Sequence, residues 1–435
     1  MRYIAVILAL MLLVGCTAPA VSDATPESSA PTTTATTVTT ITTQKPTTAP
    51  TTAVKSDKEQ VKTLLSSGQV ATIYKQSYNS IFGRVKDNGF FQESLTGRYR
   101  GEYIRSIGAL AILAIEVGET DKAGRALKFV TDTMQKQNLT MIPFTITADG
   151  NVNTADELDG RAHFVYGWAE YILNTKDTAY FDKAYALMKG ETDAFCKEPC
   201  FYESWGLMRN LRFTHTRVTD GEDYHDDFDI LTNAFVAAAL DSMITLARQN
   251  GKETDAVLWE TTLQKLKAGI AKNLTRQVDG KTVYLELRDW KDGHGVPEYG
   301  VSWVCIAPFG AGGAGLDTVV LQNTATLVRQ KLWKEAGNGG YLAVECSASG
   351  KVQNWILGKS VGWDIAGAVE SQNYAHIAAN LRFLARYHTN SVYMEKMRPN
   401  GNAFRLEDCG NGEQVIWFLW GVAKARRAVG LNVKP

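Results

Sequence analysis

Two kinds of helical segment alternate along this chain from Glu102 onward. One kind is apolar on nearly every side, as in "YIRSIGALAILAIEV" (103–117) and "DILTNAFVAAALDSMITLA" (229–247), which is typical of helices that are buried all round. The other kind is amphipathic, with apolar residues such as Trp259 and Leu263 at helical spacing. The alternation therefore predicts helices in two layers, one buried and one half-exposed.

The segments pair in chain order into helical hairpins. The expected pairs are 101–117 with 120–137, 155–174 with 177–189, 226–249 with 253–274, 300–313 with 316–334, and 360–371 with 372–388. A sixth buried segment, 412–430, lacks a following partner, and a helix expected at 57–80 can fill that place. Six hairpins in two layers predict an all-α fold, the six-hairpin (α/α) toroid. Much of its strand content is expected in one short hairpin, "KTVYLELRDW" (281–290).

Long loops are expected at one rim of this ring. In such a fold these loops line a central funnel, and the long polar, aromatic-rich ones are 138–160, 190–225, 280–300, 337–362 and 391–411. Long loops are where binding and catalytic residues usually lie. We therefore expect the functional site at this rim.

The N-terminus predicts export. The first sixteen residues, "MRYIAVILALMLLVGC", hold an apolar run shorter than the roughly 20 residues of a membrane-spanning helix, and they suit a secretion signal. "LVGC" resembles the lipobox of bacterial lipoproteins, which implies that Cys16 is lipidated and anchors the protein to the cell membrane, on the outside. An ordinary signal peptide cut elsewhere is the alternative.

A tether and one domain are expected after the signal. Residues 17–56 are rich in Thr and Pro and have few large apolar side chains to bury, so they predict a disordered linker. No second linker of this kind interrupts 57–435, which is therefore expected to be one domain.

Charge and cysteine content limit the partners. Basic and acidic residues number 46 each, with no basic run, which argues against a nucleic-acid partner. Besides Cys16 the cysteines are Cys196, Cys200, Cys305, Cys346 and Cys409. "CKEPC" (196–200) could close a small disulfide loop; buried free thiols and a metal site are the alternatives. No histidine lies at zinc-like spacing, and neither a metal nor a cofactor is expected.

Two carboxylates are the leading catalytic candidates. Glu203 lies in "FYESWG", and an apolar setting raises the pKa of a carboxyl, as a proton donor near neutral pH requires. Glu395 lies in "SVYMEKMRPNGNAF", on the last loop before the ring closes. Glu407 and Glu413, near the start of the last buried helix, and Asp227 are alternatives, although Asp227 could simply cap its helix.

Two carboxylates on opposite sides of a funnel suit the hydrolysis of a glycosidic bond. One acid protonates the departing oxygen and one base activates water. A separation of roughly 6.5 to 9.5 Å between the two carboxyls leaves room for that water and inverts the anomeric centre. Our hypothesis is a glycoside hydrolase of this inverting type that is also exo-acting.

The order of helix pairs and carboxylate clusters resembles the six-hairpin glycosidases, which include glucoamylases, trehalases and processing α-glucosidases. "EKMRPNG" (395–401) is similar to their E-x-Y-D-P-x-T-G stretch, although Met397 and Arg398 stand where Tyr and Asp are usual. "FYESWG" is similar to the general-acid segment L-W-E-E of the glucoamylases. The resemblance implies that Glu203 is the acid and Glu395 the base.

The same resemblance implies a sugar-binding set. "RYRGEYIRSIGAL" is similar to the W-x-W-D-S segment that binds the terminal sugar, and "ELDGRA" to the D-G-x-A of the second inner helix. The expected substrate-binding residues are Arg98, Glu102, Asp159, Arg161, Trp205 and Trp363. The expected partner is an oligo- or polysaccharide substrate, bound by a monomer.

Two other functions stay open from the sequence. A polysaccharide lyase or sugar epimerase on the same toroid would use Tyr, His or Arg bases, and His163, His215 and His225 fall near the rim. A non-catalytic glycan-binding lipoprotein is the second, because Met397 and Arg398 depart from the motif.

Overall fold

The computed structural model describes residues 55–209, 228–288, 302–343, 354–407 and 411–435. All of them lie in the unit Val54–Pro435, which is separate from Met1–Ala53. Cys16, Asp227, Cys346 and Cys409 lie outside the described residues.

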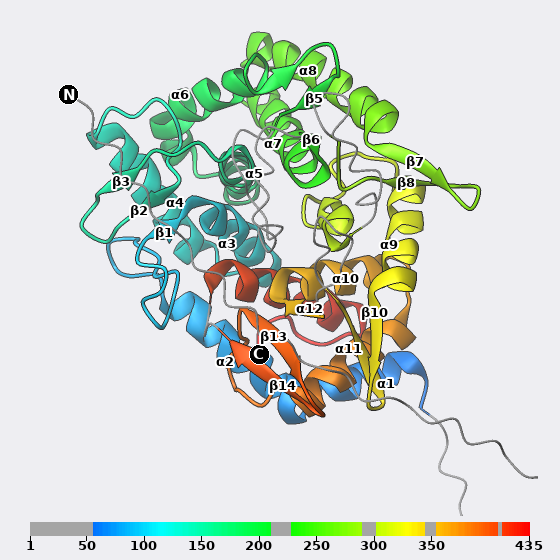
Figure 1. Cartoon of the computed structure of the whole chain (residues 1–435). Helices are drawn as coiled ribbons and strands as arrows, with labels where there is room; N and C mark the ends of the chain where they lie inside the picture. Colours follow the sequence, from blue (N-terminus) through cyan, green and yellow to red (C-terminus); the bar gives the residue numbers. More distant parts are fainter. Residues whose placement is uncertain (1–54, 210–227, 289–301, 344–353, 408–410) are drawn as a thin grey trace, which may run out of the picture. The chain divides into compact units, whose positions relative to one another are not determined.

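Six helical segments form a closed inner ring within the described part of Val54–Pro435. Each packs against the next, and the last packs against the first (Figure 1). They are α3 (Ile104–Val117), α5 (Leu158–Thr175), α7 (Ile230–Gln249), the 3₁₀ segment η2 (Trp303–Phe309), α10 (Gly358–Glu370) and α12 (Gly412–Ala428). The expected all-α toroid is therefore confirmed, with a 3₁₀ segment in place of the fourth inner α-helix because Pro308 interrupts it.

Each inner segment has an outer helix packed against it. The outer helices are α4 (Thr120–Lys136), α6 (Thr178–Phe195), α8 (Glu253–Asn273), α9 (Thr318–Leu332) and α11 (Tyr374–Tyr387), with α1 (Asp57–Ser66) and α2 (Gly68–Gly83) at the N-terminal end. The helix expected at 57–80 is in fact two helices, because Gly68 has a left-handed φ of 77°. As expected, the N-terminal helix pair supplies the partner of α12.

The expected strand hairpin at 281–290 is wrong in its pairing. β8 (Lys281–Tyr284) pairs with the preceding β7 (Thr275–Val278), while β9 (Leu287–Arg288) pairs with β6 (Phe228–Asp229). The other described strands are β1 (Glu102–Tyr103), β2 (Thr145–Ile146), β3 (Val152–Asn153), β4 (Phe201–Tyr202), β5 (Leu207–Met208), β10 (Trp333–Ala336), β11 (Gly339–Leu342), β12 (Ile356–Leu357), β13 (Lys396–Asn400) and β14 (Ala403–Glu407). Strand content is thus spread over several small sheets. Many of their strands have only two residues, too few to leave an alternating pattern.

The core lies between the two helical layers and inside the inner ring. Five tryptophans there are almost fully buried, namely Trp168, Trp259, Trp303, Trp363 and Trp417. Among the described helices, only α7 is long and apolar enough to span a membrane, and 89% of its apolar window is buried inside the protein. α7 is therefore a core helix.

Of the alternatives left open for "CKEPC", the disulfide is not formed. Cys196 and Cys200 are free thiols, as is Cys305, so the alternative of free thiols is confirmed for these three. Burial raises the pKa of both the Cys196 and the Cys200 thiol, which keeps them in the unreactive protonated form.

Candidate active site

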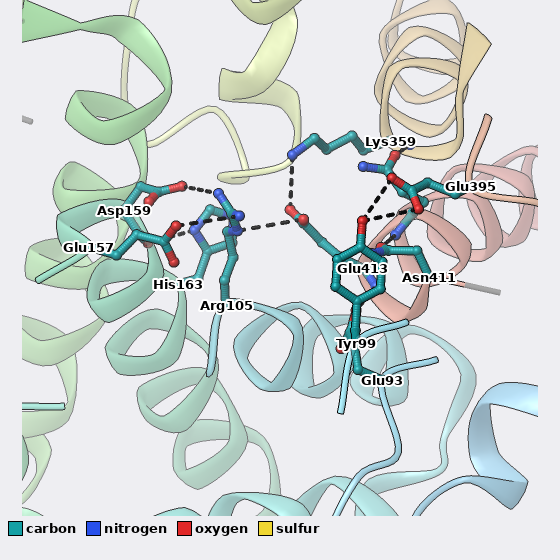
Figure 2. Close-up of polar contacts among 11 residues, drawn as sticks. Glu93, Tyr99, Arg105, Glu157, Asp159, His163, Lys359, Glu395, Asn411 and Glu413 are labelled. Atoms are coloured by element: carbon teal, nitrogen blue, oxygen red, sulfur yellow. Dashed lines mark hydrogen bonds and ion pairs between the residues drawn. The ribbon is translucent and has the colours of Figure 1, made fainter. Parts of the chain in front are cut away.

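Four charged side chains meet at the N-terminal ends of the inner helices, and each is the second residue of its helix (Figure 2). They are Arg105 of α3, Asp159 of α5, Lys359 of α10 and Glu413 of α12. Because α3 packs on both α5 and α12, and α12 on α10, side chains at the same level of neighbouring helices come into contact. With Glu157, the N-cap residue of α5, these residues form what we call the charged cluster.

Glu413 lies between the two cations of the charged cluster. Its Oε1 is 3.1 Å from the Lys359 ammonium and its Oε2 is 3.5 Å from Arg105 Nε. Both partners of the Lys359 pair are almost fully buried, with side chains 3% and 9% exposed. Burial alone would raise the pKa of Glu413, but Arg105 and Lys359 outweigh it and lower the pKa to about 2. Glu413 is therefore a fixed negative charge, which excludes it as a proton donor near neutral pH.

Arg105 also binds two carboxylates of α5. It lies 2.8 Å from Asp159 Oδ2 and 3.6 Å from Glu157 Oε1. Asp159 is fully buried, and its second oxygen, Oδ1, has no hydrogen-bond partner in the described part of the chain. Burial raises the pKa of the Asp159 carboxyl, which the ion pair with Arg105 opposes. An unpartnered buried carboxylate oxygen is costly, so this atom is suited to accept a hydrogen bond from a bound hydroxyl.

His163 lies one turn along α5 from Asp159 (Figure 2). Its Nδ1 is 2.7 Å from the carbonyl oxygen of Asp159, and because a carbonyl only accepts, Nδ1 carries the proton. The ring stacks on Phe235 at a centroid distance of 3.5 Å. Burial lowers the pKa of His163 to about 3. The imidazole is therefore neutral and a weak base at physiological pH.

Glu395 lies across the charged cluster from Asp159 and Glu157 (Figure 2). Both of its carboxylate oxygens are 3.3 Å from the hydroxyl of Tyr99, which donates to them. The Tyr99 ring packs edge-on against Tyr103, which packs in the same way against Phe144. A chain of aromatic rings thus supports the hydroxyl that orients Glu395.

The two departures from the expected motif after Glu395 have structural reasons. Met397 is fully buried in the core. Arg398 pairs with Glu407 at 2.9 Å and lies over the Trp355 ring at 3.9 Å. Glu407, an alternative catalytic residue from the sequence, ends β14 and is held there by Arg398 of the neighbouring strand β13.

The structure does not give Glu203 the apolar setting that the sequence predicted. Its side chain is 67% exposed and pairs with Lys265 of the outer helix α8. That expectation is wrong because Tyr202 and Trp205 pack toward Phe228 and leave the glutamate in solvent. Trp205 is half-buried and lies under Arg288. Among the described residues, neither Glu203 nor Trp205 contacts the charged cluster.

Two of the expected sugar-binding residues, Glu102 and Arg161, are buried with protein partners. Glu102 accepts a hydrogen bond from the Phe91 N–H at 2.6 Å. Arg161 pairs with Glu191 at 2.8 Å and with Asp156 at 3.0 Å. These carboxylate and guanidinium groups hold loops and helices together. The sequence alone could not distinguish this structural role from a role in binding sugar.

The remaining expected residues lie in the core, at the surface and in the charged cluster. Trp363 is fully buried and packs against Trp303 and Trp417 inside the inner ring. Arg98 is exposed and lies over the Tyr99 ring at 5.4 Å. Asp159 is the one that the structure brings into the charged cluster.

Arg105, Lys359 and Tyr99 were not among the predicted site residues. Arg105 and Lys359 share a signal that sequence reasoning could have used. Each is the second residue of a buried helix, as are Asp159 and Glu413. A charge at the second position of an otherwise apolar segment, repeated in four helices, predicts a polar site where those helices begin. Tyr99 lies in an irregular loop and carries no such signal.

No protein-family model matches this sequence, and no curated protein is similar to it. Solved structures with the same fold do exist. A glycosidase variant aligns over 87% of this chain and 98% of its own at a TM-score of 0.61 and 13% identity. A metal-independent alpha mannosidase from Streptococcus pneumoniae, in complex with alpha-1,6-mannobiose, covers 85% and 97% at a TM-score of 0.59 and 10% identity.

A bacterial glucoamylase complexed with acarbose is also similar, at a TM-score of 0.55 and 14% identity. It matches 87% of this chain, which spans only 57% of the glucoamylase. At such low identity the likeness concerns the fold. This chain therefore has the toroidal fold that these glycosidases share.

Proposed function

We propose that the protein is a glycoside hydrolase that cleaves oligo- or polysaccharides by an inverting, exo-acting mechanism. The observation that carries the proposal is Glu395, a carboxylate oriented by Tyr99 beside a buried charged cluster. The cluster lies at one end of a toroid that is similar in fold to solved glycosidases. A cluster of paired charges suits the hydroxyl groups of a terminal sugar, because charge-assisted hydrogen bonds are strong.

In this mechanism Glu395 is the base. Its carboxylate takes a proton from water as the water attacks the anomeric carbon. The Tyr99 hydroxyl, which contacts both carboxylate oxygens, fixes the direction in which Glu395 faces. Arg105 and Asp159 bind hydroxyls of the terminal sugar, as an exo-acting enzyme requires.

The acid comes from the segment before α7, where the sequence offers Glu203 and Asp227. Glu203 is 67% exposed and pairs with Lys265 of the outer helix α8, and no contact joins it to the charged cluster among the described residues. Asp227 immediately precedes β6 and lies three positions before the start of α7 in the sequence. α7 is an inner helix like those that carry the charged cluster. We therefore assign Asp227 as the acid in preference to Glu203.

The lyase or epimerase alternative has less support. Such chemistry needs a base that removes a carbon-bound proton, and His163 is the histidine that lies beside the charged cluster (Figure 2). Burial lowers its pKa to about 3, so it is a poor proton acceptor near neutral pH. We also propose that the protein acts outside the cell on a lipid anchor at Cys16, as the sequence of the first sixteen residues suggests, and that it acts as a monomer.

The proposal is tested with single variants on a substrate panel. The panel contains 4-nitrophenyl α-glucoside, α-mannoside and α-rhamnoside together with malto-oligosaccharides, and NMR follows the anomer that is released. We expect Glu395→Gln to lower kcat about a thousandfold, Asp227→Asn to lower it on the oligosaccharides, and the exposed Glu203→Gln to leave it unchanged. The first product should have the inverted configuration.

Two results would overturn the proposal. Unchanged turnover in both Glu395→Gln and Asp227→Asn would remove the assigned chemistry. Binding of sugars by the wild-type protein with no product from any glycan would instead favour a non-catalytic glycan-binding protein.

A further inference from the structure

A pocket that Tyr99 helps to line lies outside the charged cluster. It has a volume of about 580 Å³ and is formed mainly by the loop between α2 and α3. Tyr99 lines this pocket, and its hydroxyl is the group that contacts Glu395. Tyr99 thus joins the pocket to the catalytic base. When the scissile bond of a glycan lies at Glu395, the part of the glycan beyond that bond can reach this pocket.

The pocket is rich in hydrogen-bond donors and cations. Its lining includes Lys86, Asn88, Gln92 and Arg100 and contains no carboxylate. Among the described residues, the Lys86 ammonium and the Arg100 guanidinium have no hydrogen-bond or ion-pair partner. Asn88 uses its oxygen to accept the Phe90 N–H at 3.1 Å, which leaves its NH₂ group directed to solvent or ligand. Donors without acceptors fit a ligand that supplies anionic oxygens.

Two aromatic rings complete the pocket. Phe90 lies in its lining, is 7% exposed and packs edge-on against Phe129. Tyr99 is held in place by Tyr103. An apolar ring face among polar groups is a common arrangement for a ligand that has both an apolar face and polar edges, and a sugar ring has this character.

We propose that this pocket binds the portion of the glycan beyond the cleaved bond and selects a sugar that carries an anionic group. Lys86 and Arg100 bind the anionic oxygens, and Phe90 and Tyr99 pack against the ring. The proposal rests on the proposed function for the position of the glycan. It adds to that function a substrate class, acidic or phosphorylated glycans, that nothing in the charged cluster specifies.

The test measures binding, so that it does not depend on turnover. Ligand-observed NMR with the full chain compares D-glucuronate, D-glucose 6-phosphate, D-glucose and inorganic phosphate, for the wild type and for Lys86→Ala/Arg100→Ala. Lys272→Ala/Lys281→Ala is the control, because it removes the same charge from exposed positions on α8 and β8. Glucuronate and glucose 6-phosphate distinguish a carboxylate from a phosphate as the preferred group.

We expect at least one anionic sugar to bind about tenfold more tightly than glucose, as one charge-assisted contact allows. The Lys86→Ala/Arg100→Ala variant should lose this preference, and the control should keep it. Equal binding of glucose and both anionic sugars, or a preference that survives in the double variant, would overturn the inference. Displacement by inorganic phosphate at the same concentration as glucose 6-phosphate would overturn it too, by showing an anion site without sugar recognition.

Failure of this inference differs from failure of the proposed function. If Glu395→Gln abolishes hydrolysis while the double variant binds anionic sugars like the wild type, only the pocket assignment is wrong. If the double variant loses the preference while Glu395→Gln keeps full turnover, the pocket stands and the hydrolytic mechanism is wrong.

Discussion

Glu93 and Glu413 are neighbouring buried carboxylates whose pKa values shift in opposite directions. Glu93 Oε1 accepts the Glu413 N–H at 3.1 Å, and its backbone carbonyl accepts the Gly412 N–H at 2.9 Å. It thereby holds the N-terminus of α12, from which Glu413 reaches Arg105 and Lys359. Burial raises the pKa of Glu93 from 4.5 to about 7, whereas the two cations lower that of Glu413 to about 2.

The raised pKa of Glu93 predicts a pH-dependent stability. Its folded-state pKa lies above the unfolded value, so its contribution is fully present below pH 4.5 and is lost as the pH rises to 7. The loss amounts to about 3 kcal/mol. Glu93→Gln cannot ionise, so we expect its melting temperature relative to the wild type to increase between pH 5 and pH 8. Calorimetry at each pH measures this difference, and one that does not change with pH would contradict the assignment.

Glu413 contributes to stability with the opposite pH dependence. Its folded-state pKa is lowered, so its contribution is present above pH 4.5 and is lost as the pH falls toward 2. At pH 7, Glu413→Gln leaves the buried Lys359 and Arg105 without this counter-charge, and we expect a loss of roughly 3 to 5 kcal/mol in the free energy of unfolding. Urea titrations at pH 7 measure the loss. A variant as stable as the wild type would show that the buried cations find other partners.

The hydroxyl of Tyr99 can be tested apart from its ring. Tyr99→Phe keeps the edge-on contact with Tyr103 but removes the donor to Glu395. We expect kcat to fall about tenfold, because the base is no longer held in one orientation, while KM and the melting temperature stay close to the wild-type values. Tyr387→Phe, on the outer helix α11, is the control. An unchanged kcat would remove Tyr99 from the catalytic arrangement.

Pairs of glycines decide how closely the inner helices approach. A Cβ on Gly167 would overlap the backbone of Gly108 where α5 crosses α3, and one on Gly421 would overlap Gly362 where α12 crosses α10. Backbones in contact at these crossings bring the second residues of the helices within reach of one another. The charged cluster therefore depends on glycines that lie one turn or more away from it.

A methyl group at one of these crossings should be costly. A Cβ on Gly362 would overlap the carbonyl oxygen of Trp417, so α10 and α12 must move apart. We expect Gly362→Ala to lower the free energy of unfolding by about 2 kcal/mol or more. Gly190 of α6 is the control, because its Cβ would meet open space, and Gly190→Ala should stabilise the protein by up to about 1 kcal/mol. Equal effects of the two substitutions in urea titrations would contradict the crossing argument.

The sequence predicted the helices far better than the site, for a physical reason. Buried helices such as α3 and α7 show their burial in composition along the chain, so periodicity locates them. Whether a polar residue such as Glu102 or Arg161 faces the funnel or a neighbouring helix depends on contacts made after packing. The Glu102 partner Phe91 and the Arg161 partner Glu191 are such contacts, and no local pattern marks them.

At the scale of the whole molecule, the ring closes through segments from both ends of the described chain. α12 completes the inner ring by packing on α3, and α2 from the N-terminal end packs on α12. Tyr74 of α2 donates to the Val433 carbonyl, and the Arg426 guanidinium of α12 donates to the Leu65 carbonyl at 2.6 Å. The N-terminal helices α1 and α2 are therefore part of the fold.

This boundary predicts the effect of removing the N-terminal segment. Val54–Pro435 forms a unit separate from Met1–Ala53, and the contacts that close the ring begin with α1. A protein that starts at residue 54 should therefore keep the kcat and melting temperature of the full chain.

The same truncated protein should also move from the membrane fraction to the soluble fraction of an expressing bacterium, because Cys16 is absent. Cys16→Ser in the full chain should change the fraction in the same way with the tether retained. Membrane association that persists in both proteins would show that the anchor is not a lipid on Cys16, and a truncated protein with a lowered melting temperature would show that the domain extends further toward the N-terminus.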